Sequence, residues 1–325
     1  MTVSIDDAIE AYFDERKSEL SDSSLQNHRY QLQRFSEWSR GAGNVDSIGD
    51  IIPLKLSKFR RHRSSDINSN TMYNQLCILR LFLRFCHRMG WVREEISESI
   101  VLPRRDGGAR DSAIDPDRME ALLDELDRYP YASLTHVIAA LMWTCSMRIS
   151  GVRSLDVGDI YLDEWWIDVN HRPETGTPLK NKEVSEREIN IHPWVQDVLR
   201  DWIDDRRPDI EDSHGHTPLI ASGAGRLSRS SIRRRVCRLT ACGGVGDGYA
   251  CSADRASQCD ECVPPHDIRR TSISSWFDDV ADIELLAGRV DCSLSTMREH
   301  YDYVQNKTSA SCGVMRSICS DWHRR

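Results

Sequence analysis

Two arginines, a histidine and a tyrosine in the second half of the chain are of types that suit chemistry at a phosphodiester. They are Arg148, His266, Arg269 and Tyr301. Two guanidinium groups can hold the non-bridging oxygens of a phosphate and stabilise the charge that builds up in the transition state. A histidine can take the proton of a tyrosine hydroxyl, and the phenolate can then attack phosphorus to form a covalent phosphotyrosine. The set therefore suits attack of a tyrosine on a phosphodiester.

Three segments carry these residues in a fixed order. They are TCSMRISGVRSLDVGDI (144–160), PPHDIRRTSISSWF (264–277) and STMREHYDYV (295–304). In this order they resemble the first arginine box, the His-x-x-Arg box and the nucleophile segment of the tyrosine recombinase (integrase) family, in an Xer-like form of archaeal type. A lone His-x-x-Arg pattern occurs by chance. An arginine about 120 residues upstream and a tyrosine 32 residues downstream make the pattern much more specific.

The resemblance implies an enzyme, a DNA strand-transferase. Tyr301 would attack the scissile phosphate, release a 5′-hydroxyl and leave a 3′-phosphotyrosyl link, and a partner strand would then reseal the DNA. The implied partners are double-stranded DNA and further copies of the chain in a homotetramer, with residues 305–325 docking on a neighbour. Integration or excision of a mobile element is the expected role. Neither a membrane nor a small-molecule substrate is expected, and catalysis requires no cofactor.

The family also uses a lysine at the tip of a β-hairpin to give a proton to the leaving oxygen. Here the pattern predicts strands at 165–169 and 187–191 on either side of a polar segment. That segment contains Lys180 and Lys182, two of only six lysines in the chain. Lys180 is the preferred proton donor, and Lys182 is the alternative.

The carboxyl-terminal match leaves two points open. Tyr303 stands two residues after Tyr301 and is the alternative nucleophile. The family usually has a second His or a Trp about nine residues before its tyrosine, whereas the window 288–293 places Cys292 there. Arg289 is a candidate to contact the phosphate instead. We expect this change to slow catalysis rather than abolish it.

A cysteine-rich insertion at 242–263 separates the two arginine boxes. Cys259-x-x-Cys262 has the spacing of a metal knuckle, and the insertion has little apolar material to order it. Four thiolates could hold a structural zinc ion, with Cys242, Cys251, Cys259 and Cys262 as the ligands. Reduced free thiols are the alternative, and Cys237 is a further candidate ligand.

The chain is long enough for two domains. We expect a mainly α fold with a small β component. Residues 1–105 would form a helical, SAM-like DNA core-binding domain, 106–114 a linker, and 115–325 an α/β catalytic domain. The linker assignment rests on a Pro-, Gly- and charge-rich composition. Asp115 and Pro116 are expected to open the next helix, and the apolar residues from Leu134 to Trp143 predict a buried helix that leads into Arg148.

Within residues 5–102 the periodicity predicts helices throughout. One opens with a capping box at Ser23 and Gln26, and another runs from near Asn70 to Gly90. The second helix carries an arginine every four residues, which could follow a DNA backbone or form an ordinary exposed face: Arg80, Arg84 and Arg88.

The net charge of −8 argues against nucleic acid at first, but its distribution does not. Residues 52–110 have twelve Lys and Arg against five Asp and Glu, and residues 226–238 have six arginines and no acid. Basic surfaces on an acidic body fit a phosphate-binding groove, and solvated helix faces are the alternative. Scarce lysine with abundant Asp suggests a halophilic host.

Other classes of protein fit less well. The most apolar run, 136–145, is too short to cross a bilayer, and the amino terminus has no basic segment typical of a secretory signal, so we expect the cytoplasm. Two further functions remain open. A type IB topoisomerase would use the same residues to relax DNA, and a catalytically idle DNA-binding protein would account for the altered window at 288–293.

Overall fold

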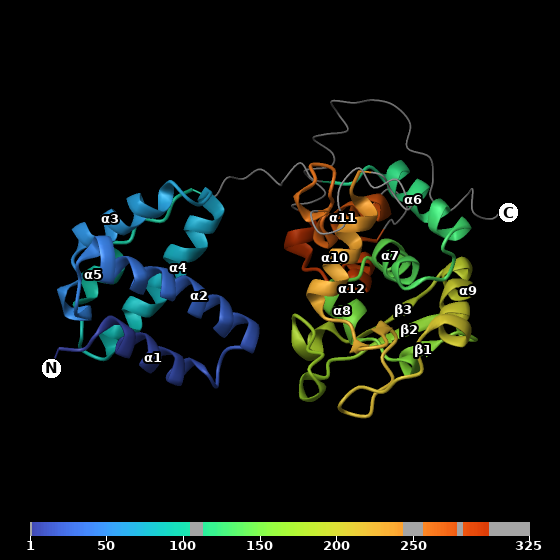
Figure 1. Ribbon diagram of the computed structural model, residues 1–325, viewed down its shortest axis with the longest axis horizontal. Coiled ribbons are helices and arrows are strands. Elements are labelled where there is room, and N and C mark those ends of the chain that lie inside the picture. Colours follow the sequence, from blue (N-terminus) through green and yellow to red (C-terminus); the bar gives the residue numbers. More distant parts are fainter. Residues whose placement is uncertain (1, 105–112, 243–255, 278–281, 299–325) are drawn as a thin grey trace. The chain divides into compact units, whose positions relative to one another are not determined.

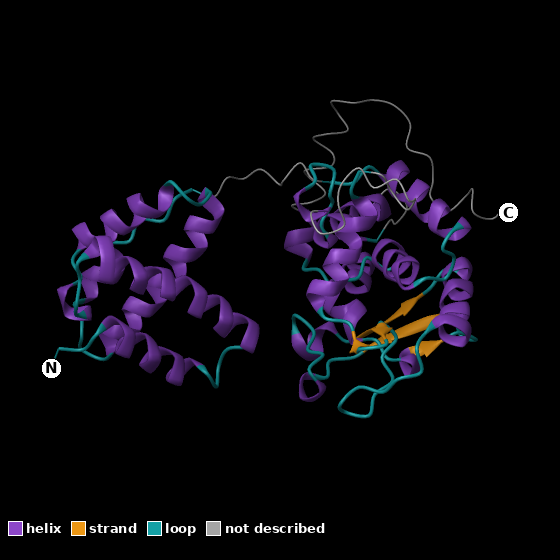
Figure 2. Ribbon diagram, viewed as in Figure 1, coloured by secondary structure: helices purple, strands orange, loops and turns teal. Residues whose placement is uncertain are grey.

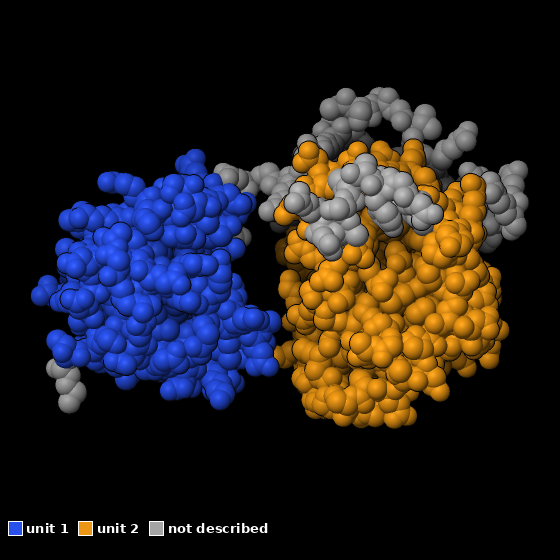
Figure 3. Space-filling view, in the orientation of Figure 1, with its two compact units in different colours: residues 1–109 blue, residues 110–325 orange. Residues whose placement is uncertain are grey.

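A computed structural model of the chain describes residues 2–104, 113–242, 256–277 and 282–298. The chain divides into two compact units, residues 1–109 and 110–325 (Figures 1 and 3). The division falls inside the segment 106–114 that its composition marks as a linker. The described residues are mainly helical, with a small β component in the second unit, as the sequence predicts (Figure 2).

The first unit is built from helices around one apolar core. Tyr12, Phe35, Phe59 and Phe82 are fully buried at its centre. The α-helices described in this unit are α1 (Ile5–Arg16), α2 (Asp22–Trp38), α3 (Pro53–Ser64), α4 (Ser69–Arg88) and α5 (Glu94–Glu98).

Two helix starts differ slightly from the sequence prediction. Ser21, not Ser23, caps α2: its backbone is extended, and its hydroxyl accepts a hydrogen bond from the Ser24 N–H at 3.4 Å. An N-cap residue must be non-helical, and Ser23 already lies within the helix, so the predicted capping box does not form. In α4, Asn68 caps the helix by accepting from Thr71 N–H at 2.8 Å.

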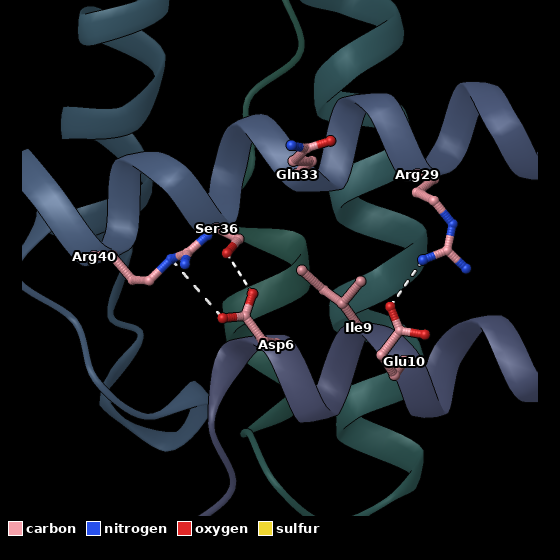
Figure 4. Close-up of a pocket in the computed structure, with 7 residues that line it drawn as sticks. All are labelled: Asp6, Ile9, Glu10, Arg29, Gln33, Ser36 and Arg40. Atoms are coloured by element: carbon pink, nitrogen blue, oxygen red, sulfur yellow. Dashed lines mark hydrogen bonds and ion pairs between the residues drawn. The ribbon is translucent and has the colours of Figure 1, made fainter.

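A pocket of about 190 Å³ lies between α1 and α2 (Figure 4). Its walls pair acids with donors: Arg29 donates to Glu10 at 2.8 Å, and Ser36 donates to Asp6 at 2.5 Å. Arg40 lies 3.8 Å from the second oxygen of Asp6. Two acids and two arginines balance one another, so these contacts join the helices and leave no surplus charge for a ligand.

The second unit is organised around α7 (Leu134–Thr144), whose residues from Leu134 to Trp143 are almost all buried. This agrees with the predicted buried helix before Arg148. Asp115 and Pro116 open α6, as expected, with the Asp115 carboxylate accepting from Asp117 N–H at 2.9 Å. The helices packed against α7 are α6 (Pro116–Arg128), α8 (Ile149–Ser154), α9 (Pro193–Asp201), α10 (Arg229–Thr240) and α11 (Pro265–Phe277).

A three-stranded antiparallel sheet lies beside these helices. Its order is β1 (Ile160–Tyr161), β2 (Trp166–Val169) and β3 (Arg187–Asn190). The β2–β3 pair is the predicted hairpin, so residues 170–186 form the long connection that contains both lysines. The strand starts one residue later than predicted because Trp165 has a left-handed backbone, with φ of 65°. A small hairpin, β4 (Ala221–Ser222) and β5 (Gly225–Arg226), follows α9, and α12 (Ile283–Val290) contacts β3 and α11.

Candidate active site

Arg148 lies at the start of α8, directly after the buried helix α7. Ser146 has a left-handed backbone, with φ of 48°, and turns the chain between the two helices, while Met147 anchors the turn in the core. The Arg148 side chain is 20% exposed and pairs through Nη1 with the carboxylate of Asp291, which is 11% exposed. The first predicted clamp residue is therefore half-buried and held by an acid that the motif does not include.

Arg269 lies on α11 and is nearly fully buried. Its Nη1 donates to the carbonyl of Ser146, and its Nη2 donates to the carbonyls of Val290 at 2.6 Å and Asp291 at 3.3 Å. Burial, and next the positive charge of Arg148, lower the Arg269 pKa to about 9, so the group remains protonated at neutral pH. The fold thus brings the two predicted clamp arginines close enough for the charge of one to act on the other, although 120 residues separate them in the chain.

Asp291 is the acceptor that connects this region to the hairpin. Besides Arg148, its carboxylate accepts from the Ser185 hydroxyl at 2.7 Å and from the Asn181 side-chain amide at 3.0 Å. Asn181 immediately follows Lys180 in the sequence. The connection that carries the predicted proton donor is therefore tied to the same carboxylate as the first clamp arginine.

Arg187 is a third guanidinium in this cluster and was not among the predicted site residues. It begins β3 and donates to the carbonyls of Arg289 and Ser185, both at 2.8 Å. Burial is the main cause that lowers its pKa, with Asp291 acting in the opposite direction. The strand alternation offered a signal, because Arg187 shares a face with the buried Ile189. Three guanidiniums with one carboxylate leave a net charge of +2 in this cluster.

The neighbouring arginines, which could be confused with the clamp, have different surroundings. Arg153 donates to the carbonyls of Leu227 at 3.1 Å and Gly176 at 2.6 Å, so it joins loops of the unit. Arg270 lies 3.5 Å from the carboxylate of Asp267 on its own helix. The charges that act on Arg153 are those of Arg226, Arg229 and Asp212 rather than those of the residues around Asp291.

His266 lies in the first turn of α11 and is exposed as a residue. Desolvation of its ring is the main cause that lowers its pKa, and Arg269, Arg270 and Lys180 act in the same direction, while Asp267 opposes them. A lowered pKa keeps the imidazole neutral at pH 7, as a proton acceptor must be. Lys180 lies on the exposed connection and is close enough to His266 to act on it. Lys182 begins the next 3₁₀ turn, Lys182–Ser185.

The two tyrosine candidates, Tyr301 and Tyr303, lie outside the described residues. The last described residues, 294–298, are helical. Ser293 caps this segment by accepting from Thr296 N–H at 3.3 Å. The assignment of the nucleophile therefore stays a prediction.

The window 288–293 forms the end of α12. Cys292 is half-buried beside the small apolar cluster formed by α11 and α12. The Arg289 guanidinium donates to the carbonyl of Asn190 at 2.9 Å and lies 5.3 Å from the ring centre of Trp276. These contacts fix the position of the Arg289 side chain, and its contact with a phosphate stays a prediction.

Comparisons with known proteins identify the family of the chain. Residues 112–306 match the Phage integrase family. This chain belongs to the phage integrase family. Tyrosine recombinase XerC of Alcanivorax borkumensis is 24% identical over 262 residues, which cover 79% of this chain and 76% of that protein. The relatives of this integrase-family chain are tyrosine recombinases, which are DNA strand-transferring enzymes.

Solved structures of integrases share its fold. A lambda integrase dimer bound to a COC′ core site superimposes with a TM-score of 0.68 at 13% identity, covering 97% of this chain and 80% of that one. The integrase of transposon Tn1549, in complex with a circular intermediate DNA, gives a TM-score of 0.69 at 12% identity, covering 95% of this chain and 99% of that one. At such low identity the likeness establishes the fold of this integrase and nothing finer.

The described cysteines of the integrase insertion, with Cys237 of α10, approach one another in two pairs. The Cys259 and Cys242 sulfurs lie 3.4 Å apart, and Cys262 interacts with Cys237. Burial is the main cause that raises the Cys262 pKa to about 12, and Cys237 adds to it. Cys251 lies outside the described residues. Within the described ranges, no three Cys, His, Asp or Glu side chains are grouped so that they could hold a metal ion.

The described ends of the insertion are also fixed by contacts that need no metal. Thr240 accepts from Val263 N–H at 2.9 Å, and Arg118 of α6 donates to the Thr240 carbonyl at 2.6 Å and to the Glu261 carboxylate at 3.3 Å.

The arginines of the two predicted basic surfaces of the integrase differ in whether they are paired within the protein or exposed to solvent. In α4, Arg80 donates to the Ile100 carbonyl, Arg84 pairs with Glu98 and Arg88 pairs with Glu15. In α10 the exposed arginines are Arg229, Arg233 and Arg234. Arg226 instead pairs at 2.5 and 2.8 Å with the carboxylates of buried Asp156 and half-buried Asp212, and its side chain is largely buried. Arg226 therefore does not contribute to the basic surface predicted at residues 226–238. Among the helices that the structure describes, none is both long and apolar enough to span a membrane.

Proposed function

We propose that this chain is a site-specific tyrosine recombinase that cuts and rejoins DNA through a 3′-phosphotyrosyl intermediate. The observation that carries the proposal is the convergence of Arg148 and Arg269 within the part of the chain that matches the integrase family. With Arg187 they create an excess of positive charge that one carboxylate does not balance. Such a cluster suits the non-bridging oxygens of a phosphodiester.

The proposed reaction uses the described side chains in separate roles. Arg148 and Arg269 hold the scissile phosphate. Neutral His266 accepts the hydroxyl proton of Tyr301 and, once protonated, donates a hydrogen bond to a phosphate oxygen. Tyr301 attacks phosphorus, the bond to the 5′-oxygen breaks, and that oxygen takes a proton from Lys180. The electrostatic link between Lys180 and His266 supports Lys180 over Lys182. The reverse reaction with a 5′-hydroxyl of another strand rejoins the DNA, so no external energy source is needed.

We propose double-stranded DNA as the partner and a homotetramer as the active assembly. Structural neighbours of the chain support both, since one is a lambda integrase dimer bound to a core site and another is a lambda integrase tetramer bound to a Holliday junction. Similarity to the integrase of transposon Tn1549 supports a role in integration or excision of a mobile element.

A structural zinc ion in the cysteine-rich insertion is part of the proposal but not of the chemistry. Cys242, Cys259 and Cys262 would bind it, with Cys251 as the fourth ligand. The close approach of the Cys242 and Cys259 sulfurs supports the first pair of ligands. The arginines supply the electrostatic stabilisation, so strand transfer itself requires no metal.

A nicked DNA duplex that traps the covalent intermediate tests the proposal. The target would first be selected from a randomised duplex library with the full chain. The wild-type chain should form a covalent protein–DNA complex, and Tyr301→Phe should not. If the complex is lost in Tyr303→Phe and kept in Tyr301→Phe, Tyr303 is the nucleophile. Holliday junctions formed between two duplexes would support a recombinase, whereas relaxation of supercoiled DNA without junctions would identify a topoisomerase. If bound duplexes are never cleaved, the chain is a DNA-binding protein.

A further inference from the structure

We propose that Asp291 is a positioning residue for strand transfer. It fixes Arg148 and the β2–β3 connection (residues 170–186), which carries Lys180, relative to each other. The inference rests on the proposed function, because it assigns a role within the same site. Asp291 lies outside the three motifs that identify the family in this sequence. It acts through Arg148 and the hairpin, and it need not touch the DNA.

The contacts of the carboxylate come from separate parts of the second unit. One oxygen accepts from Arg148 Nη1 at the start of α8 and from the Ser185 hydroxyl at 2.7 Å. The other accepts from the Asn181 amide at 3.0 Å. Since Asn181 directly follows Lys180, the position of the lysine depends on the same carboxylate as the position of Arg148.

The backbone of Asp291 makes a second connection, to the other clamp arginine. The Val290 and Asp291 carbonyls accept from Arg269 Nη2 at the carboxyl end of α12. That end of a helix attracts cations because its last carbonyls have no partner within the helix. Asp291 thus contacts Arg148 through its side chain and Arg269 through its main chain.

The backbone conformation of Asp291 favours glycine, so the turn itself does not explain why an aspartate stands here. The carboxylate of the side chain does. Asp291 has a φ of 51°, in the left-handed region that favours glycine. Its N–H donates to the Gly288 carbonyl at 3.2 Å, and the next N–H, of Cys292, donates to the Ala287 carbonyl at 3.0 Å. This is a Schellman helix end, where glycine is the usual residue. An aspartate there costs conformational energy and supplies a carboxylate that meets three donors.

The Arg148–Asp291 pair leaves the cluster positively charged and leaves donors of Arg148 that could bind a DNA phosphate. Among the described residues, Asp291 contacts Arg148 through Nη1 alone, while the guanidinium has further N–H donors that could hold a phosphate. The cluster keeps its net positive charge with the pair in place. If the carboxylate instead stood in for the phosphate, DNA would have to displace it, and its removal would speed the reaction.

Two variants separate these possibilities. Asp291→Asn keeps the shape, tolerates the left-handed backbone and removes the charge. Asp291→Gly removes the carboxylate and relieves the backbone. Asp282→Asn is the matched control, because Asp282 caps the other end of the same helix and asparagine caps equally well. Each is compared with the wild-type chain for DNA affinity, for thermal unfolding and for single-turnover cleavage of the selected nicked duplex.

We expect cleavage to fall about 10- to 100-fold in both variants, because a small misplacement of a clamping group has effects of this size. DNA affinity should be unchanged or higher, since a negative charge is lost. Both variants should unfold at a lower temperature because Arg148 loses its partner, and relief of the left-handed backbone should offset part of this loss in Asp291→Gly. Faster cleavage would overturn the proposal in favour of a carboxylate that occupies the phosphate position. A parallel loss of stability, affinity and cleavage would also overturn it, since it would show a structural role alone.

A methylphosphonate at the scissile position tests whether Asp291 acts through Arg148. This group lacks the negative charge that the guanidinium neutralises. The Asp291→Asn defect should therefore shrink on this duplex, whereas an equal defect on both duplexes would overturn the proposal.

A measurement without DNA keeps the inference separate from the proposed function. Thermal unfolding of Arg148→Gln, Asp291→Asn and the double variant should be non-additive, because the residues are in contact. Additive effects would show that the pair does not form, and they would overturn the inference even for an active recombinase. Coupling without any covalent complex from the wild-type chain would instead overturn the proposed function, and with it the role of the pair in strand transfer.

Discussion

The hydroxyl oxygens of Ser146 and Ser272 lie 2.5 Å apart in the buried contact between α7 and α11. Ser272 also donates to the Trp143 carbonyl at 2.5 Å. The Ser146 carbonyl in turn accepts from Arg269. The two serines therefore connect the turn before Arg148 to the helix that carries Arg269, so the distance between the two arginines depends on them.

Replacing Ser272 with alanine should destabilise the chain and slow cleavage together. The change leaves buried polar groups without their partner, which costs about 1–3 kcal/mol. Urea unfolding measures the loss. Ser274→Ala is the control, because Ser274 bonds only to a carbonyl of its own helix among the described contacts, and its loss should cost within about 0.5 kcal/mol. Equal effects of the two substitutions would contradict the role given to Ser272.

Arg187→Lys should slow strand cleavage by roughly tenfold or more, although it keeps the positive charge. Lysine cannot reproduce the planar fork that donates to the Arg289 and Ser185 carbonyls. Single-turnover cleavage of a nicked duplex is the measurement. Arg200→Lys is a suitable control, since Arg200 lies at the surface, 3.8 Å from Asp163. A wild-type rate in Arg187→Lys would remove this residue from the site.

Most of the fold could be predicted because its signals are local. The apolar run before Arg148 predicted α7, and alternating residues predicted the β2–β3 hairpin, with boundaries within one residue. The start of α2 was wrong by a small shift because several serines in succession compete for the cap position, and only the backbone conformation decides among them. The comparisons with integrases confirm the fold class.

The site was less predictable because its decisive contacts join distant segments. Sequence motifs pointed to Arg148 and Arg269, but nothing in the window 288–293 indicated that Asp291 would face Arg148. The family pattern directed attention to its neighbours Cys292 and Arg289, and Arg289 contacts Asn190 and Trp276. Arg187 was visible only through strand alternation, which says which way a side chain points but not what it meets.

The dependence of cleavage on pH should show an acid limb with a midpoint below 6.5. Desolvation and the neighbouring cations lower the His266 pKa from its ordinary value, so the ring stays neutral and able to accept a proton until the pH falls below that lowered value. Single-turnover rates across a pH series measure the limb. A midpoint above 6.5 would contradict the described surroundings of the ring.

Lys180→Met should raise the midpoint of this acid limb, because it removes one of the charges that lower the His266 pKa. It should also slow cleavage, since the leaving oxygen loses its proposed proton donor. Lys182→Met is the matched control on the same connection. If Lys182→Met produces both effects and Lys180→Met neither, the proton donor is Lys182.

Purified protein should contain one zinc ion per chain, and mass spectrometry of the intact protein with elemental analysis can count it. Cys259→Ser and Cys262→Ser should abolish binding and lower the unfolding temperature, whereas Cys77→Ser in the first unit should do neither. Burial raises the pKa of the Cys262 thiol, so zinc must displace its proton, and binding should weaken as the pH falls. Zinc content of Cys251→Ser and Cys237→Ser identifies the fourth ligand, because the described contacts place Cys237 beside Cys262.

Metal-free protein with the same stability in all these variants would show that the thiols are reduced and bind no zinc. Cleavage should survive removal of the metal, because the anchors at Thr240 and Val263 keep α10 and α11 joined without it.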